Sequence, residues 1–400
     1  MGLGGACQSI GTALAVIAGA TWLVLACRFA LGGRRLASLG RVEPLPDAQL
    51  PSLTVIVAAK DEERRVEQAA RSLLAQDYPG LRVSVVDDRS TDATPQILGR
   101  LAVEDPRLTV TRIDELPGGW TGKSHALAAA AARATTEWLL FTDGDVDLAP
   151  HACRRAVSLA ARDGRDHLAV GPDLEVETLG EAIFIAYFVI MFHVSQEPWK
   201  AQDPRSRGSI GIGAFNLVRR DVYERAGGHA AIRFELIDDL ALGRLLKRSG
   251  ARQAFALPAG LVGVRWHIGV RGLVRGVEKN AFAAVGYRTV PAILAVVAQL
   301  TIAVLPVFGL FLPGWIPKVG AIAAWAGAAL AYFVASRSVR VRPWQVVFMP
   351  VGGILFSYAF LRSTLLTLAR GGVVWRGTFY SLRDLRQRQD RQVSPARTGD

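Results

Sequence analysis

The fold is decided by the stretch Trp138-Leu-Leu-Phe-Thr-Asp-Gly-Asp-Val-Asp147. Its first four residues are apolar, too short a run for a helix to be preferred, and acids follow at alternate positions, Asp143, Asp145 and Asp147. This pattern predicts a buried strand that delivers carboxylates to its C-terminal end.

Asp143 and Asp145 are spaced for a shared ligand. Alternate side chains of an extended chain point the same way, so these two carboxylates can converge on one hard divalent cation. Gly144 between them leaves room for a ligand to approach the backbone. A solvated acidic turn is the alternative interpretation of an isolated Asp-x-Asp, because acids usually lie exposed. The surrounding chain favours the ligand site.

The composition indicates a membrane protein with one soluble domain. Half of the 400 residues are hydrophobic and only 20% are charged, which is too apolar for a purely soluble enzyme of this length. The net charge of +12 comes mainly from arginine. Much of this excess flanks apolar spans, which favours contact with anionic headgroups over binding to nucleic acid.

The three cysteines show no metal or disulfide spacing, as expected on a reducing cytoplasmic face.

The N-terminal region predicts a membrane anchor. Residues 6–30 are apolar and long enough to cross a bilayer core of about 30 Å. Basic residues follow this span but do not precede it, which places the N-terminus outside and the next domain in the cytoplasm. The long core and the missing basic start argue against a cleaved signal peptide. We therefore predict an anchor in residues 1–41 and a proline-containing linker in residues 42–52.

Strands and helices alternate from Leu53 onward. Strands are expected at residues 53–59, 81–86, 108–113 and 138–141, and helices at 62–76, 94–104 and 124–134. This alternation predicts an α/β domain, over residues 53–288, with a parallel sheet that has helices on both faces. Ligands of such sheets bind beyond the carboxyl ends of the strands. Three of these strands end in acids: Asp61-Glu62, Asp87-Asp88 and Asp143-Gly-Asp145.

Two further features fit a nucleotide site at this edge. Asp88 can accept hydrogen bonds from a base or a ribose, while Asp92 or Thr91 caps the next helix. The glycine-rich loop at residues 118–124 opens a helix, so its N–H groups and Lys123 can hold a diphosphate. The glycine spacing is not that of a Walker loop, and a plain helix-entry turn is the alternative.

Four motifs together carry a family resemblance. The segments Val57-Ala-Ala-Lys-Asp-Glu-Glu63, Val86-Asp-Asp-Arg-Ser-Thr-Asp92, Gly119-Trp-Thr-Gly-Lys123 and Thr142-Asp-Gly-Asp145 resemble those of the family 2 glycosyltransferases, which are inverting enzymes. The resemblance spans roughly residues 53–280. It implies a GT-A-like fold with a mixed, mostly parallel sheet, and hexosyltransferase activity with a UDP- or GDP-sugar donor.

The resemblance also assigns roles to residues at the sheet edge. It implies that Asp143 and Asp145 ligate Mg²⁺ or Mn²⁺. The nucleotide sugar would contact Ala59, Asp61, Glu62, Asp88, Lys123, Asp143 and Gly144. The family usually has Asn where Asp61 stands, so the contact to the base differs there.

Asp238 and Asp239 form a second candidate centre. They lie at the start of an amphipathic helix, where acids also stabilise the helix dipole. Adjacent carboxylates raise each other's pKa, and an inverting transfer needs one base to take a proton from the acceptor hydroxyl. By resemblance Asp239 is that base and Asp238 orients it.

Arg265 and Trp266 match only part of the family's Gln/Arg-x-x-Arg-Trp motif, since Val262 stands at its first position. The resemblance implies that they lie on the acceptor and diphosphate side. The incomplete motif argues against a processive polysaccharide synthase.

Two helices are expected between the catalytic motifs and the C-terminal spans. Residues 180–194 are apolar but short, and predict an interfacial helix or, alternatively, an internal core helix. Residues 269–287 form a basic amphipathic stretch, which we expect at the cytoplasmic membrane interface rather than on phosphate headgroups.

The C-terminal region adds apolar spans at residues 291–312, 319–335 and 346–368. Arginine clusters on both sides of the third span favour a re-entrant segment, broken at Pro350-Val-Gly-Gly353, over a full crossing. Residues 289–370 then form the membrane region. Residues 371–400 form a cytoplasmic tail that is disordered after Arg386. Trp375-Arg-Gly-Thr-Phe-Tyr380 resembles the closing segment of ceramide glucosyltransferases and hopanoid-associated glycosyltransferases.

The sequence thus predicts a multi-pass protein of the inner (plasma) membrane with a cytoplasmic catalytic domain. It would transfer a sugar to a hopanoid-like lipid, with carotenoid, sphingolipid and polyprenyl acceptors left open. The alternatives are a processive polysaccharide synthase and a non-catalytic scaffold that binds nucleotide.

Overall fold

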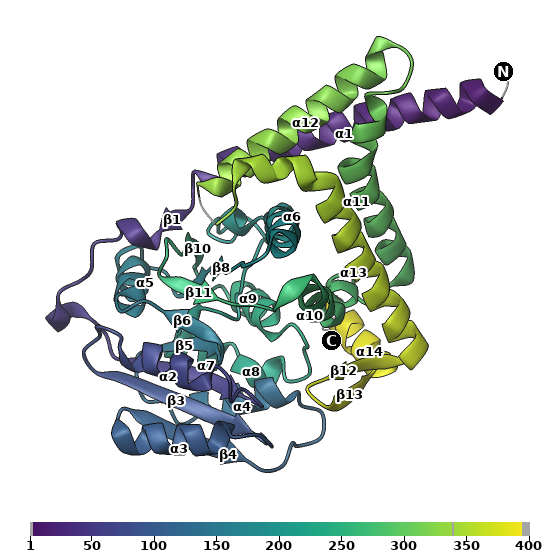
Figure 1. Ribbon diagram of the computed structural model, residues 1–400. Coiled ribbons are helices and arrows are strands. Elements are labelled where there is room, and N and C mark those ends of the chain that lie inside the picture. Colours follow the sequence, from purple (N-terminus) through teal and green to yellow (C-terminus); the bar gives the residue numbers. More distant parts are fainter. Residues whose placement is uncertain (1–2, 338–339, 394–400) are drawn as a thin grey trace, which may run out of the picture.

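The computed structural model describes residues 3–337 and 340–393 (Figure 1). In this part of the chain, eight strands form the main sheet in the order β1-β10-β7-β9-β5-β2-β3-β4. Their bounds are β1 (Ala37–Ser38), β2 (Leu53–Ala59), β3 (Leu81–Asp88), β4 (Leu108–Ile113), β5 (Trp138–Asp143), β7 (His167–Val170), β9 (Asn216–Arg219) and β10 (Gln253–Leu257). The pairs are parallel except where β9 meets β5 and β7. The expected mixed, mostly parallel sheet is confirmed.

The register brings three strand ends to one edge of the sheet. Ala58 of β2 is opposite Asp143 of β5, and Ala59 is opposite Asp87 of β3. The acids that follow these strands therefore start within one or two residues of each other across the sheet.

Helices cover both faces of this sheet. One apolar core contains α2 (Val66–Leu74), α3 (Thr94–Glu104) and α5 (Ala152–Arg162), and the other contains α4 (Gly122–Ala131) and α9 (Asp238–Arg248). β2 is buried along its whole length: Val55 and Val57 enter the first core, Ile56 and Ala58 the second. Successive side chains of a strand point to opposite faces of the sheet, so a continuous apolar run forms a strand that is buried on both faces.

Smaller elements complete the catalytic domain. A second sheet orders β6 (Val146–Leu148), β11 (Val262–Val264) and β8 (Asp173–Leu174). Short helices are η1 (Leu39–Arg41), η2 (Asp47–Gln49), η3 (Pro198–Lys200), α7 (Arg220–Arg225) and α8 (Gly228–Ala231). The expected helix at 62–76 starts later, at Val66. The reason is local: Asp61 has a left-handed φ of 54°, and the backbone N–H groups of Asp61 and Glu62 donate to Ser90 and Thr94 instead.

Long helices extend from the catalytic domain (Figure 1). They are α1 (Leu3–Gly33), α6 (Leu179–Gln196), α10 (Gly269–Ala284), α11 (Thr289–Gly309), α12 (Trp315–Ser336) and α13 (Met349–Arg370), the last preceded by η4 (Pro343–Phe348). α1 packs along α12, and α11 packs along α13. Among the described residues, five helical segments are long and apolar enough to cross a membrane: α1, α6, α11, α12 and η4 with α13. Exposed apolar side chains along α1, α11, α12 and α13 are compatible with membrane association.

α6 differs from the interfacial helix that we expected. Phe184, Tyr187 and Ile190 are fully buried, and α6 packs against both α10 and α13. This burial favours the alternative, an internal helix between the catalytic domain and the long helices.

Two expectations for the C-terminal region are wrong. The break at residues 350–353 does not occur, because Pro350 lies in the first turn of α13, where its missing N–H leaves no helical hydrogen bond unmade. The tail is not disordered directly after Arg386, because it continues as α14 (Leu382–Val393) after a hairpin of β12 (Gly372–Trp375) and β13 (Thr378–Ser381). The rest of that expectation, residues 394–400, lies outside the described residues.

The contact between α1 and α12 depends on small residues. A Cβ atom on Gly320 would lie 2.7 Å from the backbone of Ala15, so we expect Gly320→Leu to separate the two helices. Overpacking of this kind costs about 1–3 kcal/mol, and we expect the melting temperature in detergent to fall by roughly 5 °C. Gly99→Leu in α3 is the control, since open space surrounds that glycine. Equal melting temperatures for the two variants would show that the helix contact is not tight.

Candidate active site

The two acids at the end of β3 are both buried, but they have different partners. Asp87 is buried, and its carboxylate pairs with Arg112 of β4 at 3.0 Å and accepts the N–H of Ser90. Asp88 pairs with Arg89 at 2.8 Å. Its carboxylate also lies against the start of α4: a Cβ atom on Gly122 would be only 2.0 Å from Asp88 Oδ2. A glycine at position 122 is therefore required for α4 to approach the end of β3.

The acids after β2 face different ways. Asp61 Oδ1 accepts hydrogen bonds from the N–H and the hydroxyl of Thr91, so this carboxylate holds the loop after β3. Glu62 instead lies beside Gly144 and pairs with Arg376 at 2.8 Å. Ala59 is wholly buried in the core, so only its backbone is available to a ligand.

Lys123 joins the two candidate centres. Its Nζ lies 2.7 Å from Asp143 Oδ1 and 3.1 Å from Asp238 Oδ2. The Thr121 hydroxyl caps α4 by accepting the N–H of Ser124, which fixes the turn that carries Lys123. Burial works to lower the pKa of Lys123, but its carboxylate neighbours outweigh burial and raise the pKa above its ordinary value. Lys123 is therefore a permanently charged bridge between the end of β5 and the start of α9.

Asp239 lies next to the same cluster. Its two carboxylate oxygens accept the N–H groups of Gly213 and Leu240, each at 2.8 Å. A Cβ atom on Gly213 would lie 2.6 Å from Asp143 Oδ2, so a single glycine separates Asp143 from Asp239. Burial raises the pKa of Asp239, and Asp238 raises it further. A carboxylate with a raised pKa is a better proton acceptor near neutral pH.

Asp145 is the acid of the cluster that most needs a cation. Burial, helped by Asp143 and Glu62, raises the pKa of Asp145 to about 7. Within the described ranges, no three Cys, His, Asp or Glu side chains are grouped as a complete metal site. Two hard carboxylates at a strand end nevertheless fit Mg²⁺ or Mn²⁺, which commonly keep one or two protein carboxylates and fill the shell with phosphate and water oxygens. Asp147 points elsewhere, to Arg65 at 3.2 Å.

The structure does not bring Arg265 to this cluster. Its guanidinium is buried and forms two hydrogen bonds of 3.0 Å with Glu181 of α6, which also accepts the N–H of Gly269. The hydrogen bonds from the Glu177 N–H, from Arg265 and from the Gly269 N–H outweigh burial and lower the pKa of Glu181 to about 2. Trp266 packs on Phe188 with ring centroids 4.8 Å apart. Glu181 therefore already pairs with the guanidinium of Arg265, and the assignment of Arg265 and Trp266 to the acceptor and diphosphate side stays a prediction.

The sequence analysis missed two residues of the cleft. Arg376, in the turn of the C-terminal hairpin, reaches Glu62, and its charge also acts on Asp143 and Asp145. Lys279 of α10 lies over the ring of Trp375, with Nζ 4.2 Å from the ring centroid. The signals were present as a basic amphipathic helix and a Trp-Arg-Gly turn, but neither pattern reveals that the two segments converge.

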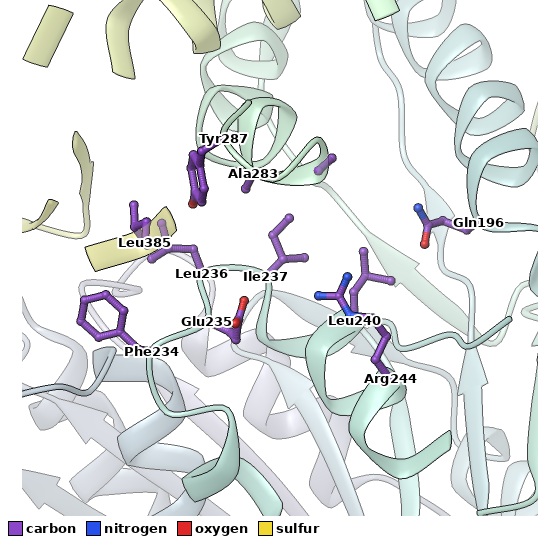
Figure 2. A pocket seen from close by; sticks show the side chains of 11 residues that line it. Gln196, Phe234, Glu235, Leu236, Ile237, Leu240, Arg244, Ala283, Tyr287 and Leu385 are labelled. Atoms are coloured by element: carbon purple, nitrogen blue, oxygen red, sulfur yellow. The ribbon is translucent and has the colours of Figure 1, made fainter. Parts of the chain in front are cut away.

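A small pocket lined by both apolar and polar side chains adjoins the start of α9 (Figure 2). Its cavity volume is about 60 Å³. Leu236, Ile237 and Leu240 line one side, and Ala283 and Tyr287 from the end of α10 line another. The pocket is therefore one residue away from Asp238 and Asp239 along the chain.

Comparison with known proteins agrees with this geometry. The family model for glycosyl transferase family 2 matches residues 54–240, a range that holds every acid described above. The chain contains a glycosyl transferase family 2 domain. This transferase is 25% identical over 338 residues to the 4,4'-diaponeurosporenoate glycosyltransferase of Staphylococcus aureus strain USA300, covering 83% of this chain and 88% of the relative.

Two further similar proteins match different shares of the chain. The same enzyme from the bovine strain RF122 / ET3-1 is 30% identical over 194 residues, covering 48% of this transferase and 50% of the relative. The mannosyltransferase PcManGT from Pyrobaculum calidifontis, solved with GDP-Man and Mn²⁺, superposes with a TM-score of 0.52 at 21% identity, covering 89% of this chain and 98% of that one. The second likeness shows that the two proteins share a fold.

The pKa of Asp145 predicts a pH-dependent stability. Its folded value of about 7 lies above its ordinary value of 3.8, so between these pH values the folded chain holds a proton that the unfolded chain has lost. Asp145 therefore destabilises the fold increasingly as pH rises from about 4 to about 7. We expect metal-free Asp145→Asn to melt at a higher temperature than the wild type at pH 8 and at the same temperature near pH 4. A difference that is independent of pH would contradict the raised pKa.

Proposed function

We propose that this transferase moves a sugar from a nucleotide sugar to a membrane lipid, with inversion at the anomeric carbon, at the cytoplasmic face of the inner membrane. One observation carries the proposal. Asp143 and the candidate base, Asp239, both lie against Gly213, and the charge of Asp143 acts on both Asp145 and Asp239. A donor and an acceptor can therefore meet there.

The donor end is the sheet edge. Asp88 and the residues around Glu62 lie where a nucleoside would bind beyond the strand ends. Asp143 and Asp145 would hold Mg²⁺ or Mn²⁺, and when bound the cation neutralises the negative charge of the diphosphate. The presence of GDP-Man and Mn²⁺ in PcManGT supports a nucleotide sugar and a divalent cation for this chain.

The acceptor end is the start of α9. Asp239 takes the proton of the acceptor hydroxyl, and the oxygen forms a bond to the anomeric carbon as the bond to the diphosphate breaks with its electron pair. The Gly213 and Leu240 amides fix the orientation of this carboxylate. Asp238, held by Lys123, is kept as a charged neighbour that raises the basicity of Asp239. Attack opposite the leaving group inverts the anomeric centre.

The pocket next to the start of α9 supports a lipid acceptor. The pocket in Figure 2 is lined mostly by apolar side chains between α9 and α10. α10 in turn packs on α13, one of the helices apolar enough for a membrane. The similar S. aureus enzymes are named for a diaponeurosporenoate acceptor, which supports a long apolar acceptor here, with hopanoid, sphingolipid and polyprenyl lipids in the same class.

The contacts made by α13 and the residues that flank it support a cytoplasmic site. Near its start, Arg340 acts on Asp173 of the catalytic domain, and at its end Arg370 pairs with Glu278 of α10. The hairpin that follows carries Arg376 into the active site. Both flanks of α13 therefore interact with the catalytic domain, through Asp173 and Glu278.

The two alternatives are less well supported. A processive synthase would need an arginine at the diphosphate, and Arg265 is bound to Glu181. A non-catalytic scaffold would retain the nucleotide edge without an organised base, whereas Asp239 is held by two amides beside the donor acids.

Asp239→Asn tests the base. We expect it to lower transfer at least 1000-fold while nucleotide affinity stays within about twofold, because the amide keeps the shape but accepts no proton. Asp114→Asn, at an exposed aspartate outside the cleft, is the control for loss of one charge. Transfer that survives in Asp239→Asn would remove this residue from the mechanism.

The substrates are identified by incubation of the full chain in detergent with UDP- and GDP-sugars and a bacterial lipid extract. We expect a glycolipid of one sugar per lipid, no product with EDTA, and recovery when Mn²⁺ or Mg²⁺ is restored. Long polymers would favour the processive alternative, and nucleotide binding without any product would favour the scaffold.

A further inference from the structure

Lys279 occupies an unusual electrostatic position. It lies on α10, outside the matched family segment, and its half-buried side chain rests on the face of Trp375. The charges that act on its ammonium group are those of Lys123, Asp238, Asp143 and Asp239, all in the reaction cleft. Lys279 is therefore a second lysine directed at the centre where the donor and the acceptor meet.

The other cations around the cleft already have carboxylate partners. Lys123 is paired with Asp143 and Asp238, Arg376 with Glu62, and Arg265 with Glu181. Over the described residues, Lys279 has no carboxylate within the 4.0 Å of an ion pair, and an aromatic face is its recorded contact. A desolvated ammonium group without an anion is costly, and burial together with Lys123 lowers the pKa of Lys279 to about 8. This site is built to receive an anion.

We propose that Lys279 binds the diphosphate of the nucleotide sugar and stabilises the negative charge that it gains on departure. This inference rests on the proposed function. As the bond from the anomeric carbon to the phosphate oxygen breaks, the electron pair stays on that oxygen, so the leaving group becomes more negative. An ammonium group fixed nearby favours that state over the bound donor. Lys279 thus supplies the cation that Arg265 cannot supply while it is bound to Glu181.

The hairpin favours the donor over the acceptor as the source of the anion. Trp375, on which Lys279 lies, is followed by Arg376, whose guanidinium lies over the same ring and acts on Asp143 and Asp145. Trp375 thereby connects Lys279 to the donor carboxylates. The pocket beside Asp239 is lined by residues further along α10, Ala283 and Tyr287.

The test is binding of UDP and GDP, each with Mn²⁺, to the full chain, measured by calorimetry without acceptor. We expect Lys279→Met to weaken the affinity for UDP and for GDP about tenfold, because a charge-assisted contact to phosphate is lost. Lys279→Arg should retain the charge and the aromatic contact, and with them most of the affinity. Arg275→Met, on an exposed arginine of the same helix, should change nothing. Uridine and guanosine should bind the wild type and Lys279→Met equally.

The outcomes separate this inference from the proposed function. If the wild type binds neither diphosphate, both fail. If Lys279→Met binds the diphosphates as the wild type does, the proposed function stands and the role of Lys279 is refuted. If only the KM of an acceptor rises in Lys279→Met, the anion belongs to the acceptor and the proposal is wrong. Weaker binding of uridine and guanosine in Lys279→Met would indicate a general structural defect and would also overturn it.

Discussion

The active site depends on one buried cation between two carboxylates. Lys123 pairs with Asp143 at the end of β5 and with Asp238 at the start of α9, which are 95 residues apart in the chain. Buried charges are tolerated only when they are paired, so removal of the lysine would leave two carboxylates facing each other. The pair of contacts holds the proposed metal-binding carboxylates and the proposed base close together. The pKa of each neighbouring acid is raised by burial next to other carboxylates: Asp145 lies near Asp143 and Glu62, and Asp239 lies beside Asp238.

Glycines make this arrangement sterically possible. Gly122 lets the first turn of α4 contact Asp88, and Gly213 lets a backbone amide pass between Asp143 and Asp239. Any side chain at either position would overlap a carboxylate. The amide of Gly213 also donates to Asp239, so the residue that permits the approach also orients the base. Close packing of backbone on acids allows a small set of segments to bring these carboxylates close together.

The sequence predicted the sheet and most of the acid cluster, because both follow from local patterns. The expected bounds of β2, α3 and β4 match the observed ones, since a buried parallel strand is a short apolar run and a helix has its own period. Asp143, Asp145 and Asp239 could be named because acids that follow strands or start helices are visible in the chain. Lys279, Arg376 and the pairing of Arg265 with Glu181 could not, since they depend on how α6, α10 and the C-terminal hairpin pack, and amphipathic patterns specify a buried face without specifying its partner. Arg265 shows the limit of a motif, because the residue type matches the family's pattern but its guanidinium pairs with Glu181.

The central claim is that Asp143, Asp145 and Asp239 belong to one reaction centre. Anomalous diffraction from crystals soaked with Mn²⁺ and a nucleoside diphosphate tests it most directly. We expect a manganese peak at the carboxylates of Asp143 and Asp145, with the terminal phosphate directed toward the cleft that contains Lys123 and Asp239. A peak at another group of acids, or a diphosphate bound on a face of the protein away from Asp239, would contradict the account.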